Sequence, residues 1–243
     1  MLTNIDLNKM NRLMEENREA KQIISQLLEN HHTTVSMIAH EIRNPLTLVS
    51  SSLQIIEAQH PEVKEFYNWN QTMEDVHFMC SLLNELSTFN NSSTLHYSVF
   101  SIEKLIKNVA VSFAISLDSE NSAIRFSSKI ASGMGDYTGD KIKLERVLLN
   151  LLKNAREAVN SDGIISLSAN RNNDNIVIQC TDNGCGISAE IINKIFDPFV
   201  TYKENGTGLG LSSSKRIVEA HGGSISAESS DDKGTVFTVT LPI

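Results

Sequence analysis

The stretch from Leu7 to Glu57 constrains the fold most strongly, because it contains no glycine and only one proline, Pro45. Apolar residues recur along it at three- and four-residue steps, as they do on one face of an α-helix. This apolar seam, which also includes His31, consists of Ile24, Leu28, Val35, Ile38, Ile42, Leu46, Val49, Leu53 and Ile56. We predict one long helix that bends at Pro45, which has no N–H to offer the Glu41 carbonyl. The apolar positions thin out before Ile24, so residues 1–23 are expected to form a coiled-coil lead-in or a frayed, solvated helix.

A second helical pattern follows a break at residues 58–61, where Pro61 is well placed to start a helix that runs to about Phe89. Its apolar residues also share one face, so the two helices are predicted to pair as an antiparallel hairpin. Two helices cannot enclose a core, and a symmetric homodimer that forms a four-helix bundle is the economical solution. We therefore expect residues 24–90 to form a dimerisation domain, with a polar linker near residues 90–96.

Composition narrows the class of protein. The 243 residues are 40% apolar, which is enough for a real core, and the net charge of −8 argues against a nucleic-acid-binding surface. Three cysteines in no paired pattern suggest neither a disulfide framework nor a zinc site, which favours a cytoplasmic location. No apolar run approaches the roughly 18 residues that span a bilayer, and the N-terminus has no signal-peptide pattern. The chain is expected to act in the cytosol, by itself or as the cytosolic part of a longer sensor protein.

Residues 97–243 alternate between strand and helix patterns. Helices are predicted from Ser101 to about Ile115, from the N-cap Asp140 to Val159, over residues 188–195, and from Leu211 to His221. Strands are predicted over residues 122–130 and in two hairpins, 164–170 with 175–181 and 224–229 with 235–241. The pattern indicates a mixed sheet with helices on one face, an α+β sandwich.

One histidine in the first helix has an unusual setting. Asn44 lies one turn after His40 on the same face, and Glu41 lies about 100° round the helix, within reach of the imidazole. His40 is outside the apolar seam and is expected to face solvent. An isolated histidine of this kind is usually an ordinary surface residue, but an adjacent acid, an amide one turn later and a mid-helix proline indicate a nucleophile.

Three further motifs suit a nucleotide, although each has an ordinary alternative. Asn150 and Asn154 share a helix face and offer oxygens of the kind that Mg²⁺ prefers, or they form a polar stripe. Asp182, with Gly184 and Gly186, places a carboxylate at a strand end where it can accept a hydrogen bond from an exocyclic amine, or forms a plain turn. A third motif, Gly206-x-Gly208-x-Gly210, lacks the dinucleotide spacing but can bring backbone N–H groups to an anion at a helix start, or is simply flexible.

In this order, the three motifs resemble the N, G1 and G2 boxes of the Bergerat-type ATPase fold of histidine kinases, gyrase and some chaperones. The run from His40 to Leu46 similarly resembles the phosphoacceptor box of sensor histidine kinases of two-component systems, and residues 196–199 resemble their F box. The resemblance covers about residues 30–243 and implies that His40 is phosphorylated from Mg·ATP. It implies catalytic roles for Glu41 and Asn44, Mg²⁺ binding by Asn154 and Asn150, and ATP binding by Asn150, Asn154, Asp182, Gly184, Gly186, Lys203, Gly206, Thr207, Gly208, Leu209, Gly210, Leu211 and Thr235.

The resemblance also sets the expected partners. It implies transfer of the phosphoryl group to an aspartate on the receiver domain of a response regulator, and it allows a phosphatase activity toward that partner. Hydrolysing relatives have a glutamate one turn before the metal-binding asparagine, and Asn150 at that place favours transfer. Glu157 departs from kinases that carry a basic residue there, which leaves the phosphate contacts on that side open. The rival functions are a phosphotransfer scaffold with an inactive nucleotide domain, and an ATPase that works by conformational change.

Overall fold

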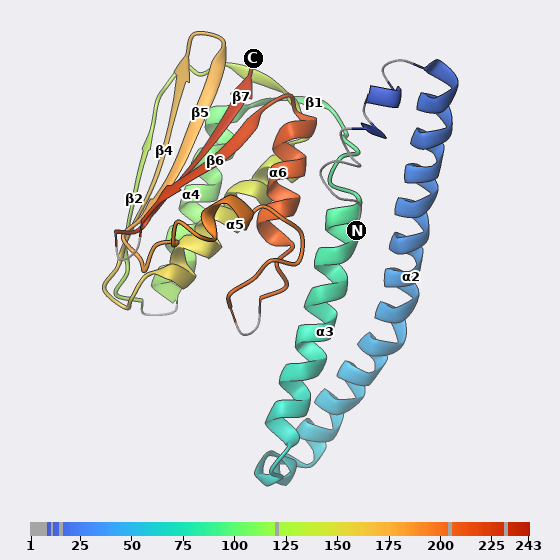
Figure 1. Cartoon of the computed structure of the whole chain (residues 1–243). Coiled ribbons are helices and arrows are strands. Elements are labelled where there is room, and N and C mark those ends of the chain that lie inside the picture. The colour runs from blue at the N-terminus through green and yellow to red at the C-terminus, as the bar shows by residue number, and fades with distance from the viewer. Residues whose placement is uncertain (1–8, 11, 15–16, 120–121, 204–205, 231–232) are drawn as a thin grey trace. The chain divides into compact units, whose positions relative to one another are not determined.

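The computed structural model describes residues 9–10, 12–14, 17–119, 122–203, 206–230 and 233–243. The chain divides into two compact units, a helical unit over residues 1–91 and an α/β unit over residues 92–243. Helix and strand labels are those of Figure 1. Within the described ranges, no helix is both long and apolar enough to cross a membrane.

The first long helix of the helical unit is α2 (Arg18–Gln59), which passes through Pro45 without ending. Asn17 caps it, because its side-chain oxygen accepts hydrogen bonds from the N–H groups of Glu19 at 2.9 Å and Ala20 at 3.1 Å. The Asn17 backbone is extended, so the helical residues 9–10 and 12–14 do not continue into α2. The prediction of one helix from Leu7 was therefore wrong at its start, although residues 1–8 lie outside the described ranges.

The second predicted helix is shorter than expected. Pro61 begins a 3₁₀ helix, η1 (Pro61–Glu65), and the helix proper is α3 (Trp69–Asn90). The two are separate because Phe66 adopts extended backbone angles, φ −70° and ψ 130°, which an α-helix cannot contain.

Helices α2 and α3 lie antiparallel, as Figure 1 shows. Two hydrogen bonds fix one register along the hairpin: Trp69 Nε1 donates to Glu57 Oε2 at 3.1 Å, and an Arg43 guanidinium nitrogen donates to the Leu83 carbonyl at 3.1 Å. In this register the last residue of α3, Asn90, is level with about Ser36. The hairpin therefore spans the second half of α2, including His40.

The predicted apolar seam of α2 is only partly covered within one chain. Ile38 is 47% exposed, Ile42 is 50% exposed and Val49 is 48% exposed, whereas Leu46 and Leu53 are half-buried. A stripe of large aliphatic side chains left in water is unfavourable, because each buried methylene is worth about 0.8 kcal/mol.

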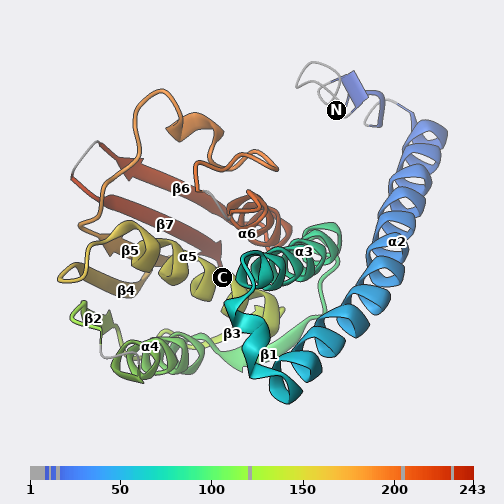
Figure 2. The same ribbon diagram turned by 90° about the horizontal axis from the view of Figure 1, so that it is seen from below.

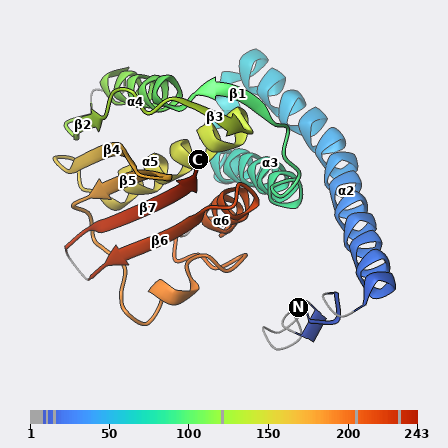
Figure 3. The same ribbon diagram turned by 90° about the horizontal axis from the view of Figure 1, so that it is seen from above.

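The α/β unit contains a five-stranded mixed sheet in the order β2-β4-β5-β7-β6, in which β2 and β4 are parallel and the other neighbours are antiparallel. Its strands are β2 (Arg125–Ile130), β4 (Ile164–Asn172), β5 (Asn175–Asp182), β6 (Ser224–Ser229) and β7 (Thr235–Pro242). Its helices are α4 (Ile102–Ser119), α5 (Lys141–Ala158) and α6 (Gly210–Ala220). Figures 2 and 3 show all three helices on one face of the sheet, which confirms the predicted fold class for this unit.

The core of this unit lies between the helices and the sheet. Every second residue of β5 faces inward, and the inward row Ile176, Ile178 and Cys180 is buried. Leu148, Leu151 and Leu152 of α5 complete the same core. Asp140 caps α5 as predicted, its side chain accepting the Lys143 N–H at 3.1 Å.

Two segments differ from the prediction. The helix expected over residues 188–195 is a run of turns with one 3₁₀ helix, η2 (Ile192–Lys194), because so short a segment cannot repay helix nucleation. A two-stranded sheet of β1 (Ser98–Ser101) and β3 (Asp136–Gly139) was not predicted at all.

His221 connects the start of α5 to the end of α6. Its Nε2 accepts the Asp140 N–H at 2.9 Å, and its Nδ1 donates to the Ile217 carbonyl at 2.7 Å. These bonds require a neutral ring, and burial lowers the pKa of His221 accordingly. The pair of bonds fixes two helices that both carry residues of the candidate site.

Candidate nucleotide and phosphoacceptor sites

Asp182 occupies the last inward place on β5, following Ile176, Ile178 and Cys180 at two-residue steps. It is therefore 5% exposed, and burial raises the pKa of its carboxyl group, although N–H groups of Gly184 and Thr235 donate to it and lower that pKa. The Gly184 N–H lies 2.8 Å from Asp182 Oδ1. A buried carboxylate at a strand end can accept a further hydrogen bond, as an exocyclic amine would require.

The turn after Asp182 rests on the end of α5. The Cys185 N–H donates to the Ala158 carbonyl at 3.1 Å. A Cβ on Gly184 would lie 2.4 Å from that same carbonyl oxygen, so any larger residue would push the turn away. Gly186 has φ +73°, a left-handed conformation that glycine adopts without strain.

The third glycine motif also fits closely. A Cβ on Gly208 would lie 2.5 Å from the Phe199 backbone, and the Phe199 N–H donates to the Gly208 carbonyl at 3.0 Å. Gly210 begins α6, and a Cβ there would lie 2.6 Å from Asn150 Oδ1 on α5. Leu209 is fully buried, and its N–H donates to Thr207 Oγ1 at 3.2 Å. These glycines therefore permit close backbone approaches, beyond any flexibility that they confer.

Asn150 joins two helices. Its Nδ2 donates to Ser214 Oγ at 2.9 Å, and that hydroxyl donates to the Gly210 carbonyl at 3.0 Å. Ser214 was not among the predicted site residues, but its place four residues after Gly210, on the same helix face, could have indicated it. Asn150 thus holds the start of α6 against α5, in addition to its predicted part in metal binding.

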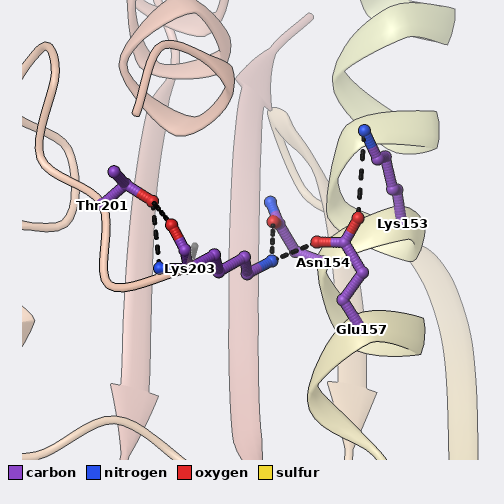
Figure 4. A network of polar contacts seen from close by, with 5 residues as sticks. All are labelled: Lys153, Asn154, Glu157, Thr201 and Lys203. Atoms are coloured by element: carbon purple, nitrogen blue, oxygen red, sulfur yellow. Dashed lines mark hydrogen bonds and ion pairs between the residues drawn. The ribbon is translucent and has the colours of Figure 1, made fainter. Parts of the chain in front are cut away.

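Asn154 lies one turn further along α5 and accepts a hydrogen bond from a cation. Lys203 Nζ donates to Asn154 Oδ1 at 2.9 Å and also pairs with Glu157. Figure 4 shows the Lys203 side chain extending from its loop to these two residues of α5. Lys153 Nζ lies 3.8 Å from the other carboxylate oxygen of Glu157. The Asn154 oxygen is therefore turned toward a place where positive charge is favoured.

Thr235, the last residue of the predicted ATP set, lies opposite Asp182 in the β5–β7 pairing and is buried. Its hydroxyl is 3.0 Å from Ser229 Oγ. Ser229 also accepts the Ile187 N–H at 2.8 Å and donates to the Gly234 carbonyl at 2.7 Å. Ser229 was not among the predicted site residues, because a serine at a strand end carries no distinctive signal.

Helix α5 brings the three motifs together. Asn150, Asn154 and Ala158 recur at four-residue steps along α5. Asn150 lies against Gly210 at the start of α6, Asn154 contacts Lys203, and the Ala158 carbonyl contacts the turn that follows Asp182. The buried carboxylate, the amide oxygens and the glycine-lined backbone match the adenine, Mg²⁺ and phosphates of Mg·ATP in that order. The residues present therefore fit this ligand.

His40 lies in the helical unit and is exposed, as predicted. Asn44 Nδ2 lies 3.4 Å from His40 Nδ1, so these two residues share one face of α2. Among the described residues, Asn44 is the one that hydrogen-bonds the ring; Glu41 is exposed beside it and makes no bond to it. The ring and its amide neighbour are thus open to a docking partner.

Comparisons with known proteins agree with this geometry. Residues 139–243 match the family of histidine kinase-, DNA gyrase B- and HSP90-like ATPases. Sporulation kinase C of Bacillus subtilis is 32% identical over 85% of this chain, and this chain covers 47% of its length. The nucleotide-free catalytic domain of histidine kinase ThkA is 31% identical with a TM-score of 0.55, covering 60% of this chain and 95% of that domain.

A second ThkA structure, in complex with the response regulator protein TrrA, covers 95% of this chain and 66% of ThkA, with 25% identity and a TM-score of 0.61. The chain thus spans about half the length of the curated relatives it matches, but nearly the whole of a solved catalytic domain. The likeness includes the glycine-lined site and extends to the histidine-bearing hairpin. This chain belongs to the family of sensor histidine kinases.

Proposed function

We propose that the chain is an ATP-dependent protein-histidine kinase core that phosphorylates His40. Residues 97–243 would bind Mg·ATP, and residues 24–90 would carry the acceptor. The observation that supports this most is that two glycine-containing motifs lie against α5, the helix that carries Asn150 and Asn154, and one of these motifs includes the buried carboxylate of Asp182. The family match adds an ATPase domain over residues 139–243, which include these motifs.

The roles of the residues follow from their chemistry. Asp182 would accept the adenine amine, and the backbone from Gly206 to Gly210 would bind phosphate oxygens. Asn154, with Asn150, would provide ligands for Mg²⁺, which neutralises phosphate charge when bound.

The transfer step needs a nitrogen with a free lone pair on His40. One neutral ring nitrogen would form the N–P bond as the bond between the γ-phosphorus and the ADP oxygen breaks, and ADP would leave. A neutral imidazole has one ring nitrogen without a proton, and that nitrogen carries the lone pair that would attack. Glu41 is the adjacent carboxylate that would accept a hydrogen bond from the other ring N–H and take up its proton as the ring gains positive charge on forming the N–P bond.

Labelling tests the reaction directly. The purified chain is incubated with γ-labelled ATP and Mg²⁺, and the label is then challenged with acid and with alkali. Phosphohistidine is expected to lose its label in acid and to keep it in alkali, and EDTA should prevent labelling. An acid-stable label, or none, would contradict the proposal.

The partner would be the receiver domain of a response regulator, to which the phosphoryl group passes on an aspartate. ThkA, with which this chain is 25% identical, has been solved in complex with a response regulator protein. Exposure of His40 on the hairpin is what such an acceptor would need, since its carboxylate must reach the phosphorylated ring.

We expect Asn44→Ala to slow dephosphorylation of the cognate phospho-regulator by at least about tenfold, equivalent to about 1.4 kcal/mol of barrier. The exposed Asn44 amide would hold a water against the phosphoaspartate, and this task does not require a nucleophilic His40. Autophosphorylation should fall much less, which is measured with labelled ATP on the same preparation. An unchanged phosphatase rate would refute this role, and equal loss of both activities would indicate a damaged helix.

We also propose that the hairpin dimerises. The exposed apolar positions of α2, Ile38, Ile42 and Val49, form a continuous stripe that a second copy of the hairpin would cover. A four-helix bundle would then bury the seam that one hairpin leaves in water.

The chain is therefore expected to be a dimer at tens of micromolar, with light scattering as the measurement. Ile42→Glu should shift the equilibrium toward monomer, because it would place a carboxylate in the buried stripe. Val99→Glu, at a position that is 70% exposed in the α/β unit, is the matched control and should leave the dimer intact. A parent chain that scatters as a monomer at these concentrations would contradict the bundle.

A further inference from the structure

Glu157 places a negative charge where a polyphosphate is expected. It lies three residues after Asn154 on α5, on the same side of the helix. A carboxylate at that place would repel an approaching phosphate chain unless a cation stood beside it. In this structure that cation is Lys203, whose Nζ contacts both Glu157 and Asn154 Oδ1.

Lys203 is held in this arrangement by its backbone as well as its side chain. Its N–H donates to Thr201 Oγ1 at 3.2 Å, and its carbonyl accepts the Gly206 N–H at 3.2 Å. Figure 4 shows the side chain extended between this turn and α5. The ammonium group therefore comes from outside the helix to the oxygen of the predicted metal ligand.

Glu157 also pairs with a second cation, Lys153, which can serve as a control for Lys203. Lys153 Nζ is 3.8 Å from Glu157 Oε1, on the same helix, but among the described residues it is the Lys203 ammonium, not that of Lys153, that donates to Asn154 Oδ1. Two cations thus pair with one carboxylate, and only Lys203 links it to the site.

We propose that Glu157 is a positioning residue that holds the Lys203 ammonium beside Asn154, so that a bound nucleoside triphosphate meets a cation there instead of a carboxylate. The inference rests on the proposed function. The ion pair is partly exposed, with Lys203 at 47% and Glu157 at 38% of full side-chain exposure. Such a pair is screened by water, and its expected effect on binding is a few-fold.

The test is a double-mutant cycle of Glu157→Gln and Lys203→Met, read as the dissociation constant of Mg·AMPPNP by calorimetry. In the parent chain, Glu157→Gln should weaken binding about threefold, because Lys203 is no longer held in place. In the Lys203→Met chain the same change should tighten binding about threefold, because it removes a carboxylate that would face phosphates and that only the more distant Lys153 still offsets. Lys203→Met alone should weaken binding about tenfold, as expected for loss of a charge-assisted contact.

This reversal of sign separates the proposal from its alternatives. A Glu157 that served the metal directly would weaken binding when changed in both backgrounds, and a Glu157 that merely repelled phosphates would tighten it in both. Either result would overturn the positioning role. Lys153→Met, which removes the other ion-pair partner of Glu157, should change binding by less than about twofold.

A rescue gives an independent readout. Glu157→Lys in the Lys203→Met chain places a cation on α5 itself, and it should restore Mg·AMPPNP affinity to within about threefold of the parent. Failure of this rescue, with thermal unfolding unchanged, would count against the inference. A parent chain that binds no Mg·AMPPNP would overturn the proposed function, and a parent that binds it normally but shows no sign reversal would overturn only the role of Glu157.

Discussion

His40→Gln is expected to abolish labelling of the chain by γ-labelled ATP while its affinity for Mg·ADP stays within about twofold of the parent. A glutamine amide is not a nucleophile at neutral pH, so the side chain has no available lone pair with which to form an N–P bond. The acceptor and the nucleotide motifs lie in separate units of the chain, which is why ADP binding should persist. Acid-labile label and calorimetry on the same preparations provide the two measurements.

His77→Gln is the matched control for this change. His77 lies exposed on α3 of the same hairpin and has no part in the proposed site, so this variant should label like the parent. Labelling that persists in the His40 variant and disappears in the His77 variant would move the acceptor to α3. Labelling retained in both would place it elsewhere.

Asp182→Asn should weaken nucleotide binding by about 50-fold or more and should, at the same time, stabilise the fold. In the complex, the asparagine NH₂ would face the adenine amine, and such an unsatisfied donor costs roughly 1–3 kcal/mol. In the free protein, the neutral amide removes the cost of burying a charge. Calorimetry with Mg·ADP measures the first effect. Asp174→Asn, in the exposed turn of the same hairpin, is the control for the substitution.

The stability effect has a definite pH dependence. Burial raises the native-state pKa of Asp182, so the native state binds this proton more tightly than the unfolded state does. The free energy of unfolding therefore falls as pH rises through the native-state pKa. The variant lacks this cost, so its advantage in denaturant midpoint should be larger at pH 7.5 than at pH 3.5, which lies below the ordinary carboxyl pKa of 3.8. An advantage that grew toward acid pH would contradict the assignment of the shift to burial.

Much of the fold could be predicted because its signals are local. The alternation in β4 and β5, the Asp140 cap and the seam of α2 each depend on neighbours within a few residues. The pairing of β1 with β3 joins four-residue segments 35 or more positions apart, and neither segment is long enough to show a pattern. The segment over 188–195 had helical composition, but it is too short to repay the cost of helix nucleation.

The candidate site also combines features that follow from local sequence patterns with contacts between residues far apart in the chain. Asp182 could be identified because it follows a strand pattern, and its inward orientation follows from the same two-residue period. The bonds from Lys203 to Asn154 and from Asn150 to Ser214 join residues 49 and 64 positions apart, and they depend on how a loop and a helix pack on α5. The sequence contains these residues but not the distances between them.

The four-residue spacing along α5 bears on the entropy of ligand binding. One face of α5 is packed into the core, so the separation of Asn150, Asn154 and Ala158 is set when the α/β unit folds. The ligand does not have to restrict the backbone freedom of these positions, because folding has already done so at roughly 1–2 kcal/mol per residue. Binding affinity at the proposed nucleotide site is thus expected to depend partly on the hydrophobic core, and not on nucleotide contacts alone.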